Sequence, residues 1–417
     1  MKTVGLITEY NPFHNGHLYH IEKTKEVTKA DYIVVIMSGD FVQRGVPAMM
    51  NKYVRTEMAL RCGADLVLEL PVCYATGSAE YFASGAIAAL DHLNVIDELC
   101  FGSECGNIDL LTSIAQVLVR EPEDFKHFLK EQLQWGLSFP SARSKALLDY
   151  FSLHDFGYEK QELEKVLHHP NNILGIEYIK ALLKRDSTIK PVTINRTISG
   201  YHETSLKDSI SSATAIRQHL MEFNQVSSLE AQIPRKVLPI LLREYGKSFP
   251  IWEDDISSIL NYKLLLEQEH GYSDFLDVST ALHHRIMNHL YDFTTYSDFV
   301  KRMSSKQFTT TRIQRSLLHI LLDIKHKDME EAIKNDYILY HRVLGFRKNS
   351  TELLSHIKKN SDLPLVTKVA SSKNLLNPYA HSMLEKDLKA SHIYHTMVTR
   401  KYNAPPYNEY RQSMIMI

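Results

Sequence analysis

Two histidines three residues apart, His14 and His17, enclose Gly16 where a short apolar run gives way to a helical pattern. The apolar run at residues 4–7 predicts a buried strand, and the spacing of residues 18–28 predicts a helix. The histidines would then lie at a helix start, where free backbone N–H groups and the helix dipole favour an anion. Two imidazoles there could hydrogen-bond phosphate oxygens and stabilise the charge that develops during attack at an α-phosphate.

Other roles for this histidine pair are less consistent with the sequence. A zinc site needs further ligands at fixed spacing, and the chain has no HExxH or comparable motif. A purely structural role is disfavoured because Asn11, Asn15 and His20 add more polar groups than a core takes. The chain also lacks GxxxxGK[ST] and GxGxxG, which excludes the two common phosphate-binding loops.

Polar residues also follow the ends of two other expected strands. Asp40 comes after the apolar run 32–37, and could orient an amine, a metal or a histidine, or only cap a turn. Gly102 ends the run 96–101 and would allow a ligand close to the backbone, although turn formation alone would also explain it. Because ligands bind off the carboxyl edge of parallel sheets, we expect these residues near the histidines. A cluster after Asp40 could meet phosphates or a carboxylate, although each member could be a solvated surface charge: Gln43, Arg44, Lys52 and Arg55.

Two further helix starts carry candidate ligand-binding groups. Asn171 and Asn172 open one helical pattern, where an asparagine could bind a ligand or serve only as an N-cap. Residues 211–217 open another, and Arg217 lies one turn into it. Several hydroxyls, N–H groups and an arginine together could hold phosphate; helix capping alone would explain the serines but not the arginine. Arg196 comes just after a further expected strand at 191–194.

The first half of the chain alternates strand and helix patterns. Because its apolar runs are nearly continuous, we predict a parallel α/β sheet covered on both faces. The expected strands are 4–7, 32–37, 66–70, 96–101 and 191–194, and the expected helices are 17–29, 51–62, 78–92, 110–119, 123–133, 141–151, 172–183 and 213–223. After about residue 225 long helical patterns dominate, at 277–289 and 311–324, and the last part adds possible strands at 337–344 and 364–368 around a helix at 350–359.

Charge divides the chain in the same way. Its 417 residues suggest two or three domains. Residues 1–225 hold 22 Lys and Arg against 28 Asp and Glu, whereas residues 226–417 hold 26 against 21, and from residue 300 onward the count is 20 against 10. A basic second half suggests a polyanionic partner, although solvated helix faces would give the same count.

The cysteine content and hydropathy predict a cytoplasmic protein with reduced thiols. The four cysteines have no CxxC spacing, and no stretch approaches the roughly 20 apolar residues that span a bilayer. The N-terminus enters a strand directly, without a basic and apolar leader. The sequence gives no indication of oligomeric state.

The motifs at 14–17 and 211–217 together resemble the two signatures of the HIGH-type nucleotidyltransferase superfamily, although Ala213 precedes Thr214 where the second motif usually reads SST. More narrowly, the segments 5–20, 38–60, 69–87, 101–104 and 170–182 are similar to the bacterial tRNA(Met) cytidine acetate ligase family, nearly end to end. The resemblance implies a Rossmann-like ATP-binding domain over 1–225 and a mainly helical tRNA-binding region over 226–417, with a possible break near 335.

The resemblance also implies a reaction. Acetate would attack the α-phosphate of ATP to give acetyl-adenylate, and the wobble cytidine of elongator tRNA(Met) would take the acetyl group to become 4-N-acetylcytidine. Mg²⁺ would accompany the ATP, and no metal site of the protein's own is implied. A KMSKS motif is absent, which argues against aminoacylation. Two alternatives remain from the residues themselves: an adenylyltransferase for a small phosphorylated metabolite, and a non-catalytic RNA-binding protein on the same fold.

Residue roles follow from the same resemblance. His14 and His17 would stabilise the transition state, and Asp40 would lie beside the acyl acceptor. Arg312 and Arg315, on the helical pattern 311–324, are expected to bind tRNA. The implied ATP-binding residues are Ile7, Thr8, Glu9, Tyr10, Asn11, Pro12, Phe13, His14, Asn15, Gly16, His17, Leu18, Tyr19, His20, Gly102, one of Asn171 and Asn172, Arg196, Ser211 and Thr214.

Overall fold

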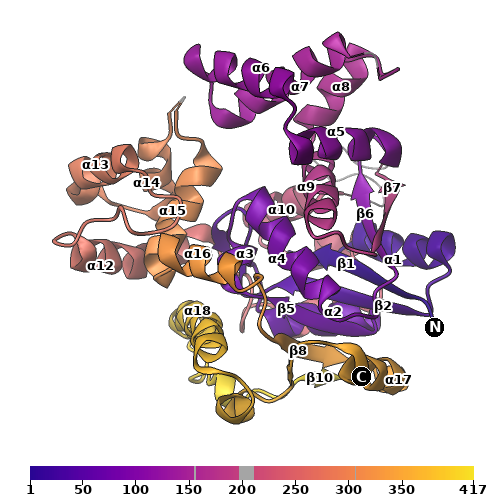
Figure 1. The fold of residues 1–417 in the computed structure, drawn as a ribbon. Coiled ribbons are helices and arrows are strands. Elements are labelled where there is room, and N and C mark those ends of the chain that lie inside the picture. The colour runs from indigo at the N-terminus through magenta and orange to yellow at the C-terminus, as the bar shows by residue number, and fades with distance from the viewer. Residues whose placement is uncertain (155, 197–210, 306) are drawn as a thin grey trace.

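The fold is built on one twisted sheet, seen in a computed structural model that describes residues 1–154, 156–196, 211–305 and 307–417 (Figure 1). Its strand order is β10-β8-β5-β2-β1-β6-β7, with β9 beside β8. The five strands from the first half of the chain are all parallel to one another, as the apolar runs predict. They are β1 (Thr3–Thr8), β2 (Tyr32–Ser38), β5 (Leu66–Leu70), β6 (Glu98–Ser103) and β7 (Lys190–Asn195).

The sheet also takes strands from the far end of the chain. β8 (His341–Phe346) pairs antiparallel with β5, and β9 (Leu365–Val366) and β10 (Ile415–Met416) run parallel to β8. The strand expected at 337–344 therefore begins at His341 instead. The sheet thus crosses the boundary expected at residue 225, so the second half of the chain completes the edge of the sheet that the first half begins.

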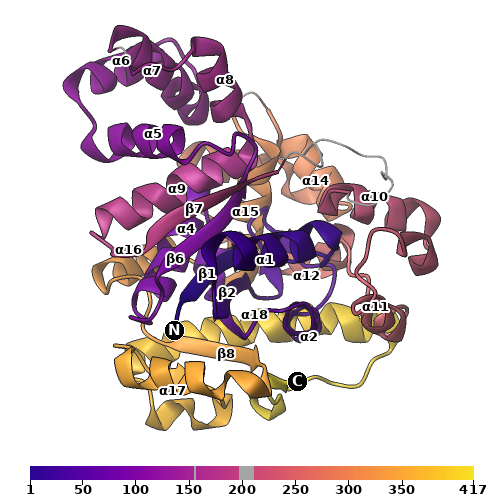
Figure 2. The same cartoon turned by 90° about the vertical axis from the view of Figure 1, so that its right-hand side faces the viewer.

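Helices cover both faces of the sheet, because alternate strand residues point to opposite sides. Ile33 and Val35 of β2 pack in the cluster that contains Ile21 and Met58, whereas Val34 packs in the larger cluster on the other face. Figure 2 shows α1 in front of the strands and α4 and α9 behind them. The helices that cover the sheet are α1 (Asn15–Thr28), α2 (Lys52–Arg61), α4 (Ala79–Asp91), α5 (Ile108–Arg120) and α9 (Pro170–Lys184), and α3 (Val72–Ala75) is a short turn before α4.

Two helical groups project from this sandwich (Figure 1). The first lies at the top of the view and joins α5 to α9: α6 (Glu123–Gln134), α7 (Phe139–Leu153) and α8 (Lys160–His168). The second lies to the left and contains α12 (Ser257–Glu267), α13 (Thr280–His289), α14 (Tyr296–Met303), α15 (Thr310–Leu322) and α16 (His326–Lys334). The remaining helices are α10 (Ala213–Phe223), α11 (Leu238–Glu244), α17 (Thr351–Asn360) and α18 (Pro378–Tyr402), with 3₁₀ turns η1 (Val226–Leu229), η2 (Glu253–Ile256), η3 (Leu290–Asp292), η4 (Lys348–Ser350), η5 (Val369–Asn374) and η6 (Glu409–Arg411).

A small hairpin, β3 (Phe41–Val42) and β4 (Val46–Pro47), joins the second helical group to the sheet. Its turn residue Gly45 has φ +80, and a Cβ there would lie 2.4 Å from the backbone nitrogen of Arg315 in α15. Tyr296 of α14 donates its hydroxyl to the Gly45 carbonyl at 2.9 Å. Only glycine combines the positive φ with so close an approach to another backbone, and this contact holds α15 against the loop that follows Asp40. Within the described ranges, no helix is long and apolar enough to cross a membrane.

Candidate nucleotide-binding site

The start of α1 is capped by the two histidines themselves. His14, at the N-cap, accepts a hydrogen bond on Nδ1 from the backbone N–H of Gly16 at 3.0 Å. His17 accepts one on its own Nδ1 from the backbone N–H of His14 at 3.3 Å. The ring centroids of the two histidines are 3.8 Å apart. Each ring therefore satisfies a backbone N–H group that a helix start leaves open, and each is fixed in orientation by doing so.

Both imidazoles are neutral, and the capping bonds determine where the proton lies. Burial, together with Arg196 and Arg217, lowers the pKa of His14 to about 3. Burial also lowers the pKa of His17 well below its ordinary value of 6.5, and His14 and Arg196 add to the effect. Since Nδ1 accepts a hydrogen bond in each neutral ring, the proton must be on Nε2. Each histidine thus presents an Nε2–H donor away from the helix end.

A third histidine and an arginine extend this donor surface. His20 lies one turn beyond His17, and burial and Arg196 lower its pKa to about 4. Its Nε2 atom is buried and has no hydrogen-bond partner within the described part of the chain. Arg196 is exposed to solvent, yet the protein around it lowers the pKa of its guanidinium by desolvation. Arg196 is thus reached by water and flanked by protein, and we call the surface formed by the three histidines and Arg196 the cleft.

Arg217 comes to the same cleft from α10. Its guanidinium donates to the carbonyl of Asn11 at 2.7 Å and to the hydroxyl of Thr214 at 3.2 Å. Desolvation and the nearby Arg44 lower its pKa to about 10, although Glu9 and Glu253 act in the opposite direction. A guanidinium whose pKa is lowered in this way is short of negative charge, which an anionic ligand would supply.

Hydroxyls at the start of α10 have local partners. Ser212 is the N-cap and accepts from the backbone N–H of Ala215 at 3.1 Å, so capping explains this serine. Ser211 is buried just before the cap, and the hydroxyl of Thr214 accepts from Arg217. Thr214 therefore orients the arginine as well as lying beside the cleft.

The loop between β1 and α1 is held from several sides. Tyr10 is buried with φ +50, a conformation that non-glycine residues rarely adopt. Asn11 accepts on Oδ1 from the backbone N–H of Met49 at 2.8 Å, and Asn15 donates from its backbone N–H to the carbonyl of Gln232 at 2.9 Å. Of the other loop residues, Ile7 and Thr8 end β1, Glu9 follows it, and Pro12 and Phe13 are buried. Gly16 is the second residue of α1, and Leu18 and Tyr19 are half-buried against the core cluster that contains Ile21 and Met58.

Gly102 lies against Arg196, and the asparagine pair is held by Glu104. A Cβ at Gly102 would lie 2.8 Å from Cδ of Arg196, so the glycine makes room for that arginine. Glu104 accepts from the Asn171 side chain at 2.6 Å and from the backbone N–H of Asn172 at 2.9 Å. Asn172 is 1% exposed, and its Oδ1 accepts from the backbone N–H of Glu104 at 2.9 Å. Asn172 is thus used within the loop, whereas Asn171 is only half-buried.

Asp40 lies at the same edge of the sheet but faces other partners. It follows β2, whose end pairs with the end of β1 through Met37 and Thr8. Its Oδ1 accepts from the backbone N–H of Lys52 at 2.7 Å, and its Oδ2 is buried without a partner in the described ranges. The titratable neighbours of Asp40 include the buried cation Lys52 and, from α18, His395, whose pKa is lowered by burial. No contact recorded for the described residues joins it to the two capping histidines.

Only part of the basic cluster after Asp40 joins the cleft. Lys52 is fully buried and lies 2.8 Å from Glu69 and 2.9 Å from Glu409. Arg55, also fully buried, donates to the carbonyls of Glu9, Ser38, Gly39 and Met50. The expectation that these two could meet phosphates is wrong, because protein groups occupy both. Gln43 donates its backbone N–H to Glu9 at 2.8 Å. Arg44 is close enough to Arg217 for its charge to lower the pKa of that guanidinium.

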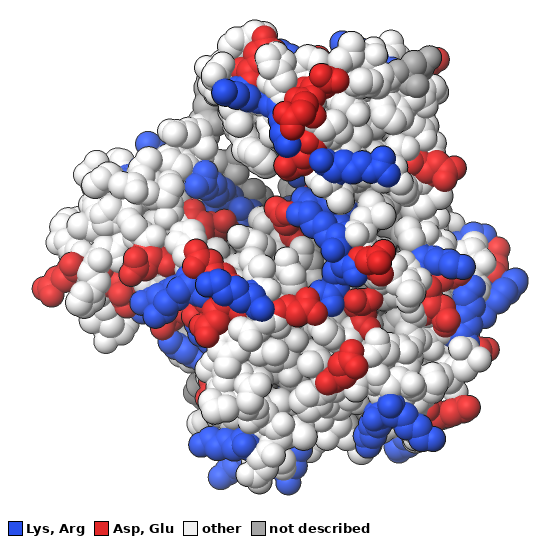
Figure 3. Space-filling view, viewed as in Figure 1, with Lys and Arg blue, Asp and Glu red and all other residues white. Residues whose placement is uncertain are grey.

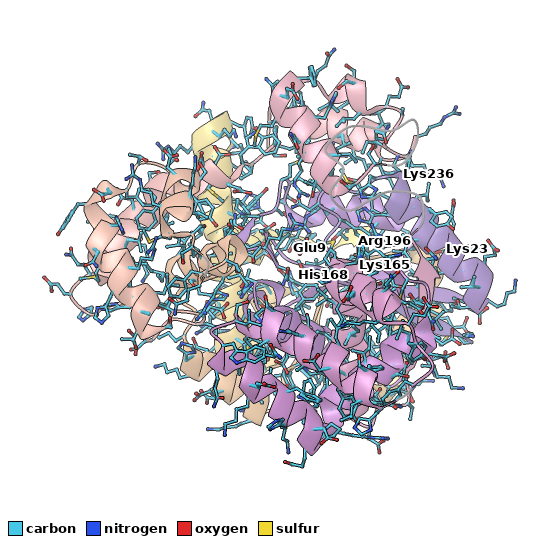
Figure 4. All side chains as sticks on the ribbon, turned by 90° about the horizontal axis from the view of Figure 1, so that it is seen from above. Glu9, Lys23, Lys165, His168, Arg196 and Lys236 are labelled. Atoms are coloured by element: carbon cyan, nitrogen blue, oxygen red, sulfur yellow. The ribbon has the colours of Figure 1, made fainter. Side chains whose placement is uncertain are left out.

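Two residues near the cleft were missed from the sequence. In Figure 4, Lys165 and His168 of α8 project toward the central region that holds Glu9 and Arg196. α8 ends two residues before α9 begins, and Asn171 there bonds Glu104 of the loop that precedes α5. Basic residues at i and i+3, opposite the buried Leu163 and Val166, are the signal that the sequence offered. Figure 3 shows Lys and Arg side chains bordering the hollow at the middle of that face, with Asp and Glu among them.

The expected tRNA contacts lie on α15. Arg315 donates to Asp277 at 2.8 Å, so an ion pair already occupies it. Arg312 is half-buried and lies over the ring of Phe308, with 5.5 Å between guanidinium and centroid. No group of three or more His, Cys, Asp or Glu side chains among the described residues could hold a metal ion.

Comparisons with known proteins agree on one family. A family model described as HIGH Nucleotidyl Transferase matches residues 1–409. The chain is 41% identical over 398 residues to the tRNA(Met) cytidine acetate ligase of Alkaliphilus metalliredigens, with 94% of each chain covered. It is 43% identical to the protein of that name from a Thermoanaerobacter species, covering 94% of this chain and 95% of the relative. The crystal structure of Thermotoga maritima TmcAL bound with alpha-thio ATP is 33% identical and superposes over 100% of both chains with a TM-score of 0.91.

Proposed function

The chain belongs to the HIGH nucleotidyl transferase family and, within it, to the tRNA(Met) cytidine acetate ligases, and from this premise we propose that it joins acetate to the wobble cytidine of elongator tRNA(Met) at the expense of ATP. The observation that carries the proposal is the cleft at the start of α1. There, two neutral histidines present Nε2–H donors, and Arg196 and Arg217 lack enough negative charge nearby. A triphosphate supplies the missing charge.

In the first step, an acetate oxygen bonds to the α-phosphorus of ATP, and the bond from that phosphorus to the oxygen bridging to the β-phosphate breaks. Pyrophosphate leaves with the electron pair, and acetyl-adenylate remains. Negative charge builds on the phosphate oxygens during the attack. Donors already fixed in place stabilise that charge without reorganising, and the capping bonds fix His14 and His17 in this way.

In the second step, the exocyclic amine of the cytidine bonds to the acetyl carbon, the bond from that carbon to the AMP oxygen breaks, and the amine loses one proton. We propose Asp40 as the carboxylate on the acyl-acceptor side, because it follows β2 at the same sheet edge and its Oδ2 has no partner in the described ranges. The alternative activity, adenylation of a small phosphorylated metabolite, would leave the basic second half of the chain without a role.

We assign the nucleotide contacts to the loop from Ile7 to His20, with Gly102, Arg196, Ser211 and Thr214. Of the asparagine pair we favour Asn171, because the Asn172 side chain is used inside the protein. Mg²⁺ would neutralise part of the phosphate charge, and it usually binds through substrate phosphates and one or two carboxylates. Glu9, which acts on Arg217, is a carboxylate that fits this need, and the described residues hold no three-ligand cage.

We further propose residues 1–225 as the catalytic region and residues 226–417 as the main tRNA-binding region, with Arg312 and Arg315 among its contacts. Its charge supports this assignment, because 26 Lys and Arg stand against 21 Asp and Glu. We place the reaction in the cytoplasm, where tRNA is found and where the four free cysteines would stay reduced.

Two measurements test the proposal. Acetate-dependent exchange of labelled pyrophosphate into ATP reports the first step, and mass spectrometry of tRNA(Met) after incubation with ATP and acetate reports the second. We expect both in the wild type. His17→Ala should slow the exchange by about 10²–10³-fold, because it removes one transition-state donor, and should leave tRNA affinity unchanged.

Three outcomes would contradict the proposal. Exchange that requires a phosphorylated metabolite and ignores acetate would indicate an adenylyltransferase. Tight tRNA binding with neither exchange nor acetylation would indicate a non-catalytic protein. Full exchange activity in the His17→Ala variant would remove the role assigned to that histidine. The variant Glu26→Gln serves as a control on the same helix, because Glu26 is exposed near the other end of α1 and lies outside the assigned nucleotide contacts.

A further inference from the structure

A second cationic site lies outside the cleft, in a groove between α2, α11 and the segment after β8. The groove has a volume of about 840 Å³. Apolar side chains of α2 and α11 form part of its lining, and charged residues from three separate segments complete it. These charged residues are Glu57, Arg61, Lys236, Arg243, Arg347 and Lys348.

The charges in this groove do not balance. Glu57 is the single carboxylate side chain in its described lining, and it is shared by Arg61 at 2.9 Å and Arg243 at 2.8 Å; Arg243 also pairs with Glu244, beside the groove, at 2.8 Å. Lys236 and Lys348 are exposed and have no ion pair within the described part of the chain. Arg347 lies 3.8 Å from Asp65, which is at the limit of an ion pair. The three arginines of the groove therefore have carboxylates within ion-pair distance, whereas Lys236 and Lys348 add two positive charges that no ion pair among the described residues matches.

The groove is coupled to the nucleotide site through the backbone. Asn15, at the start of α1, donates its backbone N–H to the carbonyl of Gln232 and its side-chain amide to the carbonyl of Ala231, both at 2.9 Å. Lys236 follows four residues later, and α11 then lines the groove. Figure 2 shows α2, α11 and the C-terminal end on the same face as α1. In Figure 4, Lys236 and Lys23 lie to one side of Glu9 and Arg196.

We propose that this groove binds the phosphodiester backbone of the substrate tRNA while the acceptor base occupies the cleft. The inference rests on the proposed function, which supplies RNA as the substrate. The volume far exceeds that of one phosphate ion, and the cations come from segments far apart in the sequence, as an extended polyanion requires. The apolar lining offers surface to ribose rings between phosphates.

The groove adds a contact that the cleft alone lacks. A base held in a cleft is positioned only as well as the backbone on which it is carried, and phosphate contacts set that position. Because Asn15 lies beside the N-cap His14 and bonds the carbonyls of Ala231 and Gln232, RNA backbone bound at Lys236 would lie on a segment that is attached to the start of α1. We therefore expect the groove to act on tRNA binding and to have no effect on the activation of acetate.

The test is a double charge reversal, Lys236→Glu with Lys348→Glu. We expect the Kd for tRNA(Met) to rise at least about tenfold near physiological salt, and the slope of log Kd against log salt to fall by about 1.4–1.8. Acetate-dependent pyrophosphate exchange should be unchanged. The matched control reverses two exposed lysines, Lys130 of α6 and Lys160 of α8, which lie at the far end of the molecule in Figure 2.

Further variants keep the result interpretable. The double variant Lys236→Arg with Lys348→Arg keeps the charge and should retain wild-type affinity. Should the glutamate pair fail to fold, Lys236→Ala with Lys348→Ala removes charge only and should change affinity in the same direction. Unchanged affinity and salt slope in the reversed or alanine pair, or an equal loss in the control, would overturn the groove proposal. Absence of acetate-dependent exchange in the wild type would instead refute the proposed function.

Discussion

Two groups of cations lie at the same edge of the sheet, and their pKa values move in opposite directions. In the cleft at the start of α1, Arg196 is exposed and Arg217 half-buried, and desolvation lowers the pKa of both. Beneath α18, Lys52 and Arg342 are almost wholly buried. Burial alone would lower their pKa values too, but nearby carboxylates and tyrosines raise them instead.

The difference separates the proposed ligand site from a structural one. Lys52 lies between Glu69 and Glu409, so its charge is matched inside the protein and nothing remains for a ligand. Arg196 and Arg217 are matched only in part, so they are ready to receive an anion that comes from outside. Burial alone would be a poor indicator of function here, because the more buried of the two groups is the structural one.

The buried group also explains how the chain's end is held. Glu409 comes from η6, near the end of the chain, and lies 2.9 Å from Lys52 of α2. Tyr53 donates to Glu409 at 2.8 Å and accepts from Arg342 of β8 at 3.0 Å. Asp387 of α18 accepts from the backbone N–H of Val72 at 2.7 Å. The last part of the chain is thus tied to the first half by matched buried charges.

Removing one member of the matched group should give the largest effect on stability. We expect Lys52→Met to lower the free energy of unfolding by about 3–5 kcal/mol, because it leaves Glu69 and Glu409 buried without their cation. Denaturant unfolding measures it. The control is Lys23→Met, which breaks the exposed pair with Glu26 and should leave stability nearly unchanged. Equal stability in the two variants would mean that the buried charges do not hold the end of the chain in place.

For the cations of the cleft, we expect a substitution to change the stabilisation by ATP more than the stability of the ligand-free protein. We expect saturating ATP, at about 100 times its Kd, to stabilise the wild type by about 2.7 kcal/mol. Arg217→Met should abolish most of that gain, because it removes an unmatched guanidinium, while costing less stability without ATP than Lys52→Met does. Thermal unfolding with and without ATP measures both. A large ligand-free loss with an intact ATP response would place Arg217 among the structural cations.

Sequence patterns recovered the elements that carry their own signals. Helix α10 begins and ends where predicted, because Ser212 caps it and Asn224 leaves it in a left-handed conformation. The helix expected from 277 begins at Thr280 instead, because Asp277 has φ +66 and Ser279 is the cap. The pairing of β8 with β5 had no local signal, since the partner strand is distant in the sequence.

The same limit applies to the site. The spacing of His14 and His17 indicated phosphate chemistry, but their reciprocal capping, which fixes the tautomer, is visible only in three dimensions. Lys52 and Arg44 are equivalent as letters in a basic cluster. The ion pair with Glu409, far along the chain, shows that Lys52 is a buried structural cation. The effect of Arg44 on the pKa of Arg217 shows that Arg44 lies beside the cleft.

The neutral histidines predict a specific dependence on pH. His14 has an ordinary pKa of 6.5 and a folded value of about 3. Between these values the unfolded chain binds the proton and the folded one does not, so stability falls as pH falls from 6.5 toward 3. Its share is at most about 1.4 kcal/mol per pH unit. His14→Asn keeps a capping oxygen but does not titrate, so its stability should fall less steeply over that range.

Chemical unfolding at pH 7, 6 and 5 measures this difference, with His219→Asn as the control, because His219 lies on α10 at the surface. Identical pH slopes for wild type and His14→Asn would show that His14 is not held neutral. The same variant should remain slow in pyrophosphate exchange at every pH, because asparagine restores the cap without restoring the Nε2–H donor. Full activity in His14→Asn would reduce the histidine to its capping role.

The smallest expected effect compares Arg312 with Arg315 on α15. Arg315 is paired with Asp277, whereas Arg312 lies over the face of Phe308 and makes no ion pair among the described residues, although it adds to the lowering of the Asp277 pKa. Arg312→Glu should therefore raise the KM for tRNA a few-fold and lower the salt slope of binding by about 0.7–0.9, one phosphate contact, with stability unchanged. Arg315→Glu would place two carboxylates together and should lower stability first. The opposite result would be that only Arg315→Glu weakens tRNA binding while the variant remains folded. A cation already paired with a carboxylate would then bind the ligand, and the contrast between paired and unpaired cations would not hold on the surface of this protein.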